Sequence, residues 1–450
     1  MFTAEAAERK RAMLRRIALE TLAALSPERL VREAIACDGA ALSIAGRRWD
    51  LRACPRITLA ALGKAAAPMM RGALHALAPL IDAGGALPAD RIRGVVVAPV
   101  EAWDQPESVP RGMEQYLGGH PEPNQGSLIA AQALRRAVAA TPPGGLILHL
   151  ISGGGSALAE EPLPGLALDD LRRTHRALVH SGAPIGAINA VRKHLSAIKG
   201  GRLALAAHPE IGQISLLLSD VPPGDLSSIS SGPTCPDPST LADCGRILQE
   251  YRPELPEAVT AALLAPSSQE TPKPGDAGFA RSSWHVLMDN AGLQAEAARK
   301  AQAAGLAPVI VDDADEWEYR RAADFLLERL AAEKRSRPYA CIIAGGEVLV
   351  KVEGTPGRGG RNQAFALYCA QSISGSDTCV LSLGTDGVDG NSPAAGACVD
   401  GGTAARARAA GLDIAQALAR FDAYPLLAAT GDAITTGPTG NNLRDLRLLA

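Results

Sequence analysis

Short apolar runs that end in glycine-containing loops constrain the fold of this chain more than any other feature. The runs contain no Asp, Glu, Lys or Arg, which indicates strands buried on both faces of a sheet. They span Ile57–Leu62, Gly94–Val100, Leu146–Ile151 and Ile214–Leu218. Helical patterns lie between them, for example over residues 128–139 and 166–178. Strands that alternate with helices predict a doubly wound α/β domain with a mainly parallel sheet.

The rest of the chain predicts a second α/β unit and a connecting segment. Residues 4–35 have the apolar spacing of one or two helices, and Pro266–Arg281 is rich in Pro, Ser and Gly, which is typical of a surface insertion or linker. A strand, a helix and a strand are expected over 285–288, 291–304 and 308–311. We then expect a strand over 340–346 with a hairpin partner over 348–352, a helix from Asn362 and a strand over 379–383. The predicted domains are an N-terminal domain over 1–265, a linker and connecting α/β segment over 266–338, and a C-terminal domain over 339–450.

Composition and charge argue against several classes of protein. The 450 residues carry a formal net charge of -3 and only 3% aromatic residues, which argues against a nucleic-acid-binding protein. No apolar run reaches about 18 residues, and no signal-like apolar region follows the N-terminus, so we expect no membrane association and a cytoplasmic location. The scattered cysteines predict free thiols rather than a disulfide framework.

Polar residues follow several of the apolar runs, at the strand ends where open α/β sheets bind ligands. Lys64 follows the first run and is a candidate for binding a phosphate or carboxylate, unless it is an ordinary solvated lysine. The loop Ser152-Gly153-Gly154-Gly155-Ser156 opens a helix, so its backbone N–H groups suit an anion, unless it is only a tight turn. Asp220 precedes a Ser/Gly loop that contains Ser231, Gly232 and Thr234. A carboxylate there suits Mg²⁺ held with nucleotide phosphates, although it could instead cap a turn.

Four further polar stretches lie later in the chain. The basic stretch Asn189–Arg202 contains Lys193 and His194, and its alternative interpretation is a solvated helix face. Arg361 and Asn362 begin a helix after a glycine loop, where an arginine offers a fork for a carboxylate or phosphate. Asp386 and Asp389 lie in a glycine-rich loop, which suggests a base, a metal ligand or a flexible turn. Asn441 belongs to a Gly/Thr/Asn cluster that is either frayed or folded back onto the site.

Taken together, these segments resemble the class II (MOFRL-type) glycerate kinase family. The resemblance runs in order over roughly residues 10 to 447, and its specificity comes from the whole set. It rests on Gly63-Lys64, Gly119-His120-Pro121, Ser152–Ser156, Asn189–Arg202, Ser219-Asp220-Val221, Ser231–Thr234, Gly345-Gly346-Glu347, Gly359–Gln363, Gly384–Gly390 and Gly437–Asn442. It implies an N-terminal Rossmann-like domain, a smaller C-terminal MOFRL-type α/β domain, and an active site in the interdomain cleft. One departure is Ala364, where the family often carries Glu, and this difference bears on substrate preference.

The resemblance also implies an activity and roles for residues. The expected reaction is ATP-dependent phosphorylation of D-glycerate, mainly to 2-phosphoglycerate, with ATP and Mg²⁺ as cofactors. Lys64, Arg361, Asp386 and Asp389 are the expected catalytic residues, with the choice between the two aspartates left open. The expected nucleotide-binding residues are Ser152, Gly153, Gly154, Gly155, Ser156, Asp220, Ser231, Gly232 and Thr234. Substrate contacts are expected from Lys193, His194, Asn362 and Asn441, and a metal contact from Asp220 or Asp386. The expected partners are D-glycerate and ATP, with a homodimer left open.

Two other classes of function are considered. Proteins of this kind are often labelled hydroxypyruvate reductase, but a reductase would need a GxGxxG nicotinamide fingerprint after its first strand. The first expected strand is followed instead by Gly63-Lys64-Ala65-Ala66-Ala67. A non-catalytic binding module for a sugar acid or nucleotide would not need both the aspartate pair and the Lys/Arg set. Both alternatives are therefore weaker than the kinase interpretation.

Overall fold

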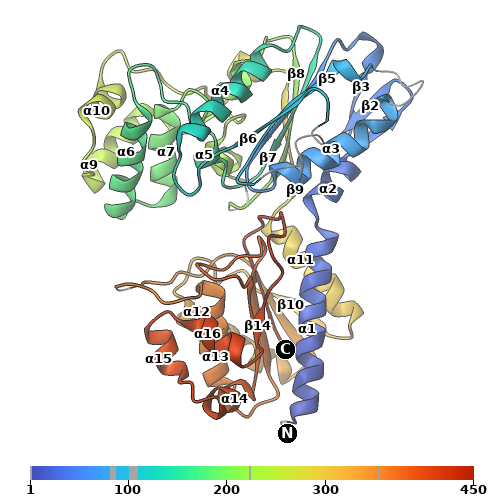
Figure 1. Cartoon of the computed structure of the whole chain (residues 1–450), viewed down its shortest axis with the longest axis vertical. Coiled ribbons are helices and arrows are strands. Elements are labelled where there is room, and N and C mark those ends of the chain that lie inside the picture. The colour runs from blue at the N-terminus through green and yellow to red at the C-terminus, as the bar shows by residue number, and fades with distance from the viewer. Residues whose placement is uncertain (1–2, 82–87, 101–109, 222–223, 353) are drawn as a thin grey trace. The chain divides into compact units, whose positions relative to one another are not determined.

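The computed structural model describes residues 3–81, 88–100, 110–221, 224–352 and 354–450, which form two compact units (Figure 1). One unit contains residues 27–287, and the other contains residues 1–26 and 288–450. This division differs from the predicted boundaries in two places. The N-terminal helix belongs with the C-terminal residues, and the expected connecting segment is divided between the two units. The reason is packing, because Leu14, Ile17 and Leu22 of that helix are buried in one core with sheet residues such as Leu381 and Leu448.

The unit of residues 27–287 is built on a six-stranded sheet in the order β6-β5-β4-β7-β8-β9. The strands are β4 (Ile57–Leu62), β5 (Ile92–Ala98), β6 (Met113–Leu117), β7 (Leu146–Ile151), β8 (Gly212–Leu218) and β9 (Ser282–Met288). All pairings from β6 through β8 are parallel. The chain first adds strands on one side of β4 and then on the other, so right-handed crossovers place α3 (Ala66–Ile81) and α4 (Gln125–Ala139) on opposite faces. The predicted doubly wound parallel sheet is confirmed.

A small antiparallel sheet and a group of helices complete this unit. The small sheet contains β1 (Ile35–Asp38), β2 (Ala41–Ile44) and β3 (Arg47–Asp50). The remaining helices are α2 (Pro27–Ala34), α5 (Gly155–Leu158), α6 (Leu168–His180), α7 (Ile185–Leu195), α8 (Arg202–Leu205), α9 (Leu241–Tyr251) and α10 (Glu257–Leu264). Apolar residues of α6, α7, α9 and α10 form a core of their own, and these helices lie together in Figure 1.

The second unit has a mixed sheet in the order β10-β11-β15-β12-β13-β14. Its strands are β10 (Ala307–Ile310), β11 (Ala340–Ala344), β12 (Cys379–Gly384), β13 (Gly396–Asp400), β14 (Ala433–Ile434) and β15 (Asp445–Leu449). Only β10 and β11 are parallel, and the other pairings are antiparallel. The predicted hairpin partner over residues 348–352 is wrong. Both edges of β11 are already paired, with β10 and β15, and Leu349 instead forms a single bridge with Glu318.

Helices cover both faces of this mixed sheet. Successive residues of a strand face opposite sides, so Ile342 joins the core with α12 and α13, whereas Cys341 and Ile343 join the core with α1 and α11. The helices are α1 (Ala4–Ala24), α11 (Asn290–Ala303), α12 (Tyr319–Lys334), α13 (Arg361–Ser372), α14 (Thr403–Ala409), α15 (Ile414–Ala419) and α16 (Ala423–Ala429). The unit is therefore a three-layer α/β structure, in agreement with the predicted fold class.

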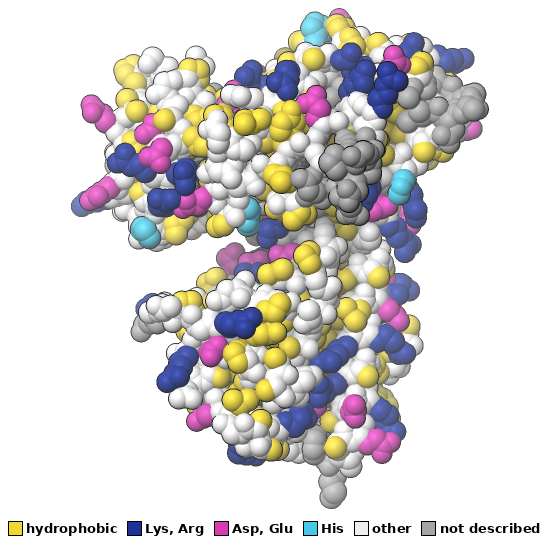
Figure 2. Space-filling model, in the orientation of Figure 1, with side chains coloured by type: hydrophobic (Ala, Val, Ile, Leu, Met, Phe, Trp, Pro, Cys, Tyr) yellow, Lys and Arg dark blue, Asp and Glu magenta, His cyan; other side chains and the backbone are white. Residues whose placement is uncertain are grey.

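Three general features complete the description. No helix within the described residues has the length and apolar character needed to cross a membrane. All eight cysteines are free thiols, as the sequence predicts. On the face shown in Figure 2, Lys and Arg side chains are interspersed with acidic, apolar and uncharged ones.

Candidate functional site

The order of strands reverses between β4 and β7, and the loops that follow these two strands pack against each other. The Lys64 N–H donates to the Gly153 carbonyl at 2.9 Å, and the Ala65 N–H donates to Ser152 Oγ at 2.9 Å. Gly63 has a φ of 125°, and a Cβ there would lie 2.4 Å from the Ser152 carbonyl oxygen. The side chain of Lys64 lies over Gly154, where a Cβ would be 2.9 Å from Lys64 Cγ. The structure thus brings together Lys64 and the glycine loop at the edge where such sheets bind ligands.

Only part of the glycine loop is available to an anion. The Ser152 N–H donates to the Leu62 carbonyl at 3.0 Å, and the Gly155 N–H donates to Ser230 Oγ at 2.9 Å. Within the described parts of the chain, the N–H groups of Gly153 and Gly154 have no hydrogen-bond acceptor. The helix that follows, α5, has only four residues, so its dipole adds little. Anion binding here therefore depends on these two amides and on the Lys64 ammonium.

The serine loop after β8 supports the glycine loop from behind. Ser230 and Ser231 have φ values of 51° and 60°, a left-handed conformation that costs a non-glycine residue free energy. Hydrogen bonds stabilise it. Ser230 Oγ donates to the Ser152 carbonyl at 2.6 Å, Ser231 Oγ lies 2.7 Å from Ser156 Oγ, and Ser231 Oγ also donates to Asn189 Oδ1 at 3.3 Å. These contacts give the serines a role in positioning the loop.

Two other predicted nucleotide-binding residues of this loop are enclosed. Thr234 is buried and its hydroxyl accepts a hydrogen bond from Ser215 on β8 at 2.9 Å. A Cβ on Gly232 would lie 2.6 Å from the Ser227 carbonyl oxygen, so this glycine allows a close backbone approach. Both residues shape the loop from inside rather than presenting groups to a ligand.

The predicted metal-binding carboxylates lie in separate loops. Asp220 is partly buried two residues beyond the end of β8, and Asp386 is partly buried two residues beyond the end of β12. Among the residues that the structure describes, no three His, Cys, Asp or Glu side chains are arranged to hold a metal ion. Mg²⁺ is usually held by one or two carboxylates together with substrate phosphates. Single carboxylates therefore fit an ion that arrives with a nucleotide, rather than a resident metal.

The structure places Lys193 and His194 in a buried polar network instead of at an open substrate site. Lys193 Nζ lies 2.9 Å from Asp237 Oδ1 and donates to Ser227 Oγ at 3.3 Å. His194 Nδ1 lies 2.8 Å from the Ala190 carbonyl, and its Nε2 lies 3.1 Å from Glu270 Oε2. Both side chains are almost completely inaccessible to solvent. A substrate could reach them only if this network opened, so their role as substrate contacts stays a prediction.

In the second unit, Arg361 is held by two carboxylates at the start of α13. Its Nε and Nη2 atoms lie 2.9 and 3.2 Å from the two oxygens of Asp445. Its Nη2 also lies 2.7 Å from Glu347 Oε1. Burial acts to lower the pKa of Arg361, but Asp445 and Glu347 raise it overall, so the guanidinium stays charged. The side chain is 34% exposed and can still meet a ligand.

The sequence did not reveal the carboxylates that position Arg361. Glu347 lies in a Gly-Gly-Glu segment that resembles the family, but its partner could not be identified. Asp445 stands in no motif, and it lies 84 residues from Arg361 in the chain. Asp445 also accepts a hydrogen bond from the buried Arg447 at 3.0 Å, so it holds two guanidinium groups. The available signal was the presence of two charged residues, Asp445 and Arg447, in an otherwise apolar final strand.

The two candidate aspartates of the glycine-rich loop have different environments. Asp389 is buried and accepts hydrogen bonds from the backbone N–H groups of Asn362 and Gln363, at 3.1 and 2.8 Å. It therefore caps the first turn of α13. Burial is the main cause that raises the pKa of Asp389 to about 6. Asp386 is partly exposed, and its Oδ1 accepts from the Val388 N–H at 3.2 Å.

The Gly/Thr/Asn segment near the C-terminus folds back onto the Asp386 loop. The Thr439 N–H donates to the Asp386 carbonyl at 3.1 Å. A Cβ on Gly387 would lie 2.0 Å from the Gly437 carbonyl oxygen, so Gly387, with a φ of 88°, permits the close approach. Of the two alternatives drawn from the sequence, the segment is folded back rather than frayed.

The asparagines predicted to contact substrate are enclosed. Asn362 is buried, and its Oδ1 accepts from Ser382 Oγ at 2.6 Å. Asn441 is buried, and its Nδ2 donates to the Leu22 carbonyl at 3.4 Å. Ala364, which departs from the family pattern, lies in the apolar core under α13. This difference from the family pattern therefore lies in the apolar core, and it gives no direct reason to expect a different substrate preference.

Comparisons with known proteins agree on one family. Residues 13–264 match a domain of unknown function, DUF4147, and residues 340–445 match the MOFRL family. The chain is 37% identical over 396 residues to D-glycerate 2-kinase of Thermotoga maritima, which covers 87% of this chain and 89% of that protein. It is 40% identical over 402 residues to a protein of Agrobacterium vitis that is provisionally named hydroxypyruvate reductase, covering 88% of this chain and 87% of that protein. A crystal structure of glycerate kinase from Thermotoga maritima superimposes with a TM-score of 0.82 at 34% identity, covering 98% of this chain and 99% of that one.

Proposed function

The chain belongs to the glycerate kinase family that joins a DUF4147 domain to a MOFRL domain, and we propose that it transfers the terminal phosphoryl group of ATP to D-glycerate. The main product is 2-phosphoglycerate. The observation that carries this proposal is the position of Lys64 over Gly154 where the strand order reverses, beside the free amides of Gly153 and Gly154. Two backbone N–H groups and an ammonium form a phosphate-binding arrangement.

We assign the phosphates of ATP to this loop. Phosphoryl transfer requires mainly positioning and neutralisation of charge, and Lys64 supplies a positive charge that its packing over the glycine loop holds in place. Ser156, Ser230 and Ser231 hold the loop in its conformation through their hydroxyl groups. Mg²⁺, when bound with the nucleotide, neutralises phosphate charge, with Asp220 or Asp386 as its protein ligand.

We assign the acceptor chemistry to the second unit. Arg361 neutralises charge on the transferring phosphoryl group or on the glycerate carboxylate, and Asp445 fixes the direction of its guanidinium. Asp386 is the better candidate to accept the proton of the C2 hydroxyl, because the carboxylate of Asp389 is already used to cap α13. Asp386 is also partly exposed, whereas Asp389 is buried.

A coupled assay of ADP release tests the proposal. We expect release from Mg-ATP that depends on D-glycerate, with little release on L-glycerate or hydroxypyruvate, and 2-phosphoglycerate as the main product. Lys64→Ala and Arg361→Ala should each lower kcat/KM by about 100-fold or more. Arg408→Ala, which removes an exposed arginine from α14, is the control and should leave the rate unchanged. Near-normal turnover in a folded Lys64→Ala or Arg361→Ala variant would remove that residue from the mechanism.

The name of the Agrobacterium relative makes reduction of hydroxypyruvate a second candidate. The turn after β4 argues against it. Gly63-Lys64-Ala65-Ala66-Ala67 leads straight into α3 without the glycine pattern of a dinucleotide site. Oxidation of NADH or NADPH in the presence of hydroxypyruvate, at a rate comparable to ADP release with D-glycerate, would favour the reductase.

A further inference from the structure

A cluster of charged side chains surrounds Arg361 in the second unit, and its carboxylates outnumber its guanidinium groups. The ion pairs of this cluster are Arg361–Asp445, Arg361–Glu347, Arg447–Asp445, Arg444–Asp315 and Arg444–Glu316. Three guanidinium groups are therefore matched by four carboxylates of the chain itself. An anionic ligand that approaches Arg361 meets no surplus of positive charge as long as all of these pairs remain.

The guanidinium of Arg361 has two edges that can form paired hydrogen bonds. The edge of Nε and Nη2 faces Asp445, at 2.9 and 3.2 Å. The edge of Nη1 and Nη2 is left for a ligand, and Nη1 has no hydrogen-bond or ion-pair partner among the described residues. Glu347 Oε1 lies 2.7 Å from Nη2, so a carboxylate of the chain already occupies part of this edge. A ligand oxyanion needs both nitrogens for the bidentate geometry that arginine favours.

The carboxylate of Glu347 is held less firmly than that of Asp445. Asp445 is 1% exposed and pairs with two guanidinium groups. The side chain of Glu347 is 36% exposed, and within the part of the chain that the structure describes its one ion pair is with Arg361. The backbone of Glu347 is fixed, since its N–H donates to Asp315 Oδ1 at 2.9 Å and its carbonyl accepts from the Glu316 N–H at 2.8 Å. Rotation of the side chain alone would therefore free the outer edge of Arg361.

Electrostatics also favour release of this carboxylate. Burial, followed by the charge of Asp445, raises the pKa of Glu347 above its ordinary value, although Arg361 and Arg444 act to lower it. A raised pKa means that the ionised carboxylate is less stable in this position than in water. Turning towards solvent therefore costs the carboxylate little, and a ligand has only to replace its single ion pair.

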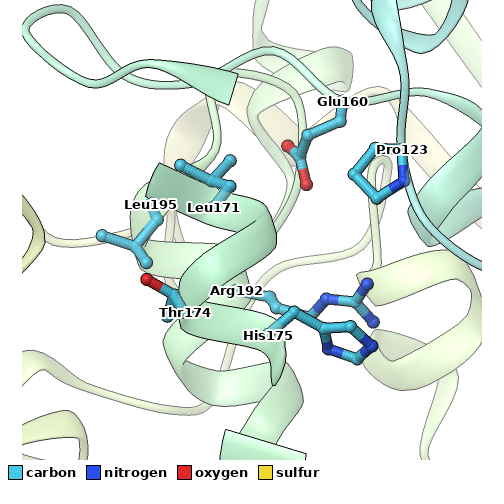
Figure 3. A pocket seen from close by; sticks show the side chains of 7 residues that line it. All are labelled: Pro123, Glu160, Leu171, Thr174, His175, Arg192 and Leu195. Atoms are coloured by element: carbon cyan, nitrogen blue, oxygen red, sulfur yellow. The ribbon is translucent and has the colours of Figure 1, made fainter. Parts of the chain in front are cut away.

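A carboxylate of the first unit shows the opposite situation (Figure 3). Glu160 lines a pocket together with Arg192 and His175, and this pocket has space for about one water molecule. Glu160 pairs with Lys199, and their side chains are only 4% and 1% exposed. Glu160 has almost no solvent to turn into, and no ligand larger than a water can take its place. Glu347 differs in both respects, because it is partly exposed and contacts an arginine whose outer edge is open.

We propose that Glu347 occupies the ligand-binding edge of Arg361 in the free protein and is displaced when a substrate oxyanion binds there. The oxyanion is the carboxylate of the hydroxy acid or the transferring phosphoryl group, and its identity rests on the proposed function. Glu347 is thus a specificity-determining residue that acts through Arg361. It lowers the affinity of Arg361 for every anion, so that an anion held by Arg361 alone is rejected and a substrate with further contacts is retained.

Removal of the charge of Glu347 tests this proposal by calorimetric titration of the full chain with D-glycerate and, separately, with ATP. Glu347→Gln keeps the length of the side chain, and we expect it to bind the displacing substrate about 3- to 10-fold more tightly, because a neutral amide competes more weakly for Arg361. A lower Kd for D-glycerate identifies the carboxylate as the displacing group, and a lower Kd for ATP identifies the phosphoryl group. Glu347→Ala should show the same gain. Glu328→Gln, the same change at an exposed position of α12, is the control and should bind as the parent does.

A double variant shows whether the gain acts through Arg361. Glu347→Gln should bring no gain in affinity when Arg361 is already replaced by Ala. A side chain that only supports the fold would not tighten binding when it is replaced. The proposal fails if Glu347→Gln and Glu347→Ala bind both substrates no more tightly than the parent, or if the gain persists without Arg361.

Sulfate separates this proposal from the proposed reaction, because it is an oxyanion that is neither a phosphoryl donor nor an acceptor. We expect Glu347→Gln to bind sulfate more tightly than the parent does, again only while Arg361 is present. If D-glycerate is not phosphorylated but the variant shows this gain with sulfate, the reaction fails and the displacement stands. If D-glycerate is phosphorylated and the variant binds sulfate and both substrates no more tightly than the parent, the displacement fails and the reaction stands.

Discussion

Replacement of Lys193 by Met distinguishes a structural lysine from a substrate-binding one. The sequence placed Lys193 among the substrate contacts, whereas the structure pairs it with Asp237 inside the protein. Their side chains are 5% and 0% exposed. Methionine keeps the length of the side chain but leaves the Asp237 carboxylate without its cation. We expect Lys193→Met to lose stability and not specifically substrate affinity.

The size of the effect follows from the groups that remain around Asp237. Removal of one partner from a buried ion pair costs about 3–5 kcal/mol. The lower end applies here, because Asp237 still accepts hydrogen bonds from the Ser239 N–H and hydroxyl and from Thr271 Oγ1, at 2.9, 2.7 and 2.9 Å. For a unit of this size, about 3 kcal/mol corresponds to a fall of roughly 6–10 °C in melting temperature.

The dependence on pH provides a second measure of the same pair. Burial acts to raise the pKa of Asp237, but Lys193 and Ser239 lower it overall. The folded pKa lies below the unfolded one, so the carboxylate stabilises the protein above the unfolded pKa and this contribution is lost as the pH falls. In Lys193→Met the acid-induced loss of stability should be smaller than in the parent protein.

Calorimetric melting and steady-state kinetics of the same variants test this reasoning. Lys193→Met should melt at a lower temperature, and its folded fraction should keep the KM for D-glycerate within about two-fold. The double variant Lys193→Met with Asp237→Leu should recover most of the lost stability, because an apolar pair can replace a buried ion pair. A stable Lys193→Met with a KM for D-glycerate raised 10-fold or more would refute the structural role.

Two other predictions concern the second unit. Burial raises the pKa of Asp389 to about 6, above its ordinary value of 3.8. Protonated Asp389 therefore stabilises the folded state fully at pH values below 3.8. About 3 kcal/mol of this stabilisation is lost as the pH rises through 6. Urea unfolding of the parent and of Asp389→Asn between about pH 4 and 7 should show the difference in stability changing with pH, and a constant difference contradicts the assignment. Asp445→Asn should lower kcat about 10-fold, since Arg361 loses its bidentate partner, and should lower the melting temperature, since the buried Arg447 loses its counter-ion. An unchanged kcat would show that Asp445 does not position Arg361.

Much of the fold could be predicted from the sequence because buried parallel strands have a strong local signal. β4 and β7 begin and end at the predicted residues, β5 is shifted by two residues at both ends, and β8 begins two residues earlier than predicted. The prediction of a hairpin after β11 was wrong because nearness in the sequence does not decide strand pairing. A strand pairs with whichever strands the fold brings beside it, here β10 and β15. The position of α1 was missed for the same reason, since its apolar stripe does not specify which sheet covers it.

The candidate site was predictable where a loop follows a strand directly. Lys64 and the glycine loop follow neighbouring strands β4 and β7, so their proximity comes from the order of the sheet. Lys193, His194, Asn362 and Asn441 were predicted from the sequence as substrate contacts. The structure buries these four side chains with polar partners. Nothing local in the sequence distinguishes a buried lysine with a carboxylate partner from an exposed lysine without one.

The sequence by itself determined the strands, the loops at their ends and the residue types that can bind phosphate. Only the tertiary structure decided which charges are paired, which are enclosed and which stay open. Lys193 and Asp237 are 44 residues apart in the chain, and Arg361 and Asp445 are 84 apart. Arg192 has no ion-pair partner among the described residues although it adjoins two residues that are fully engaged. The reason is that strand formation depends on nearby residues, whereas ion pairing depends on which distant segments the packed core brings into contact.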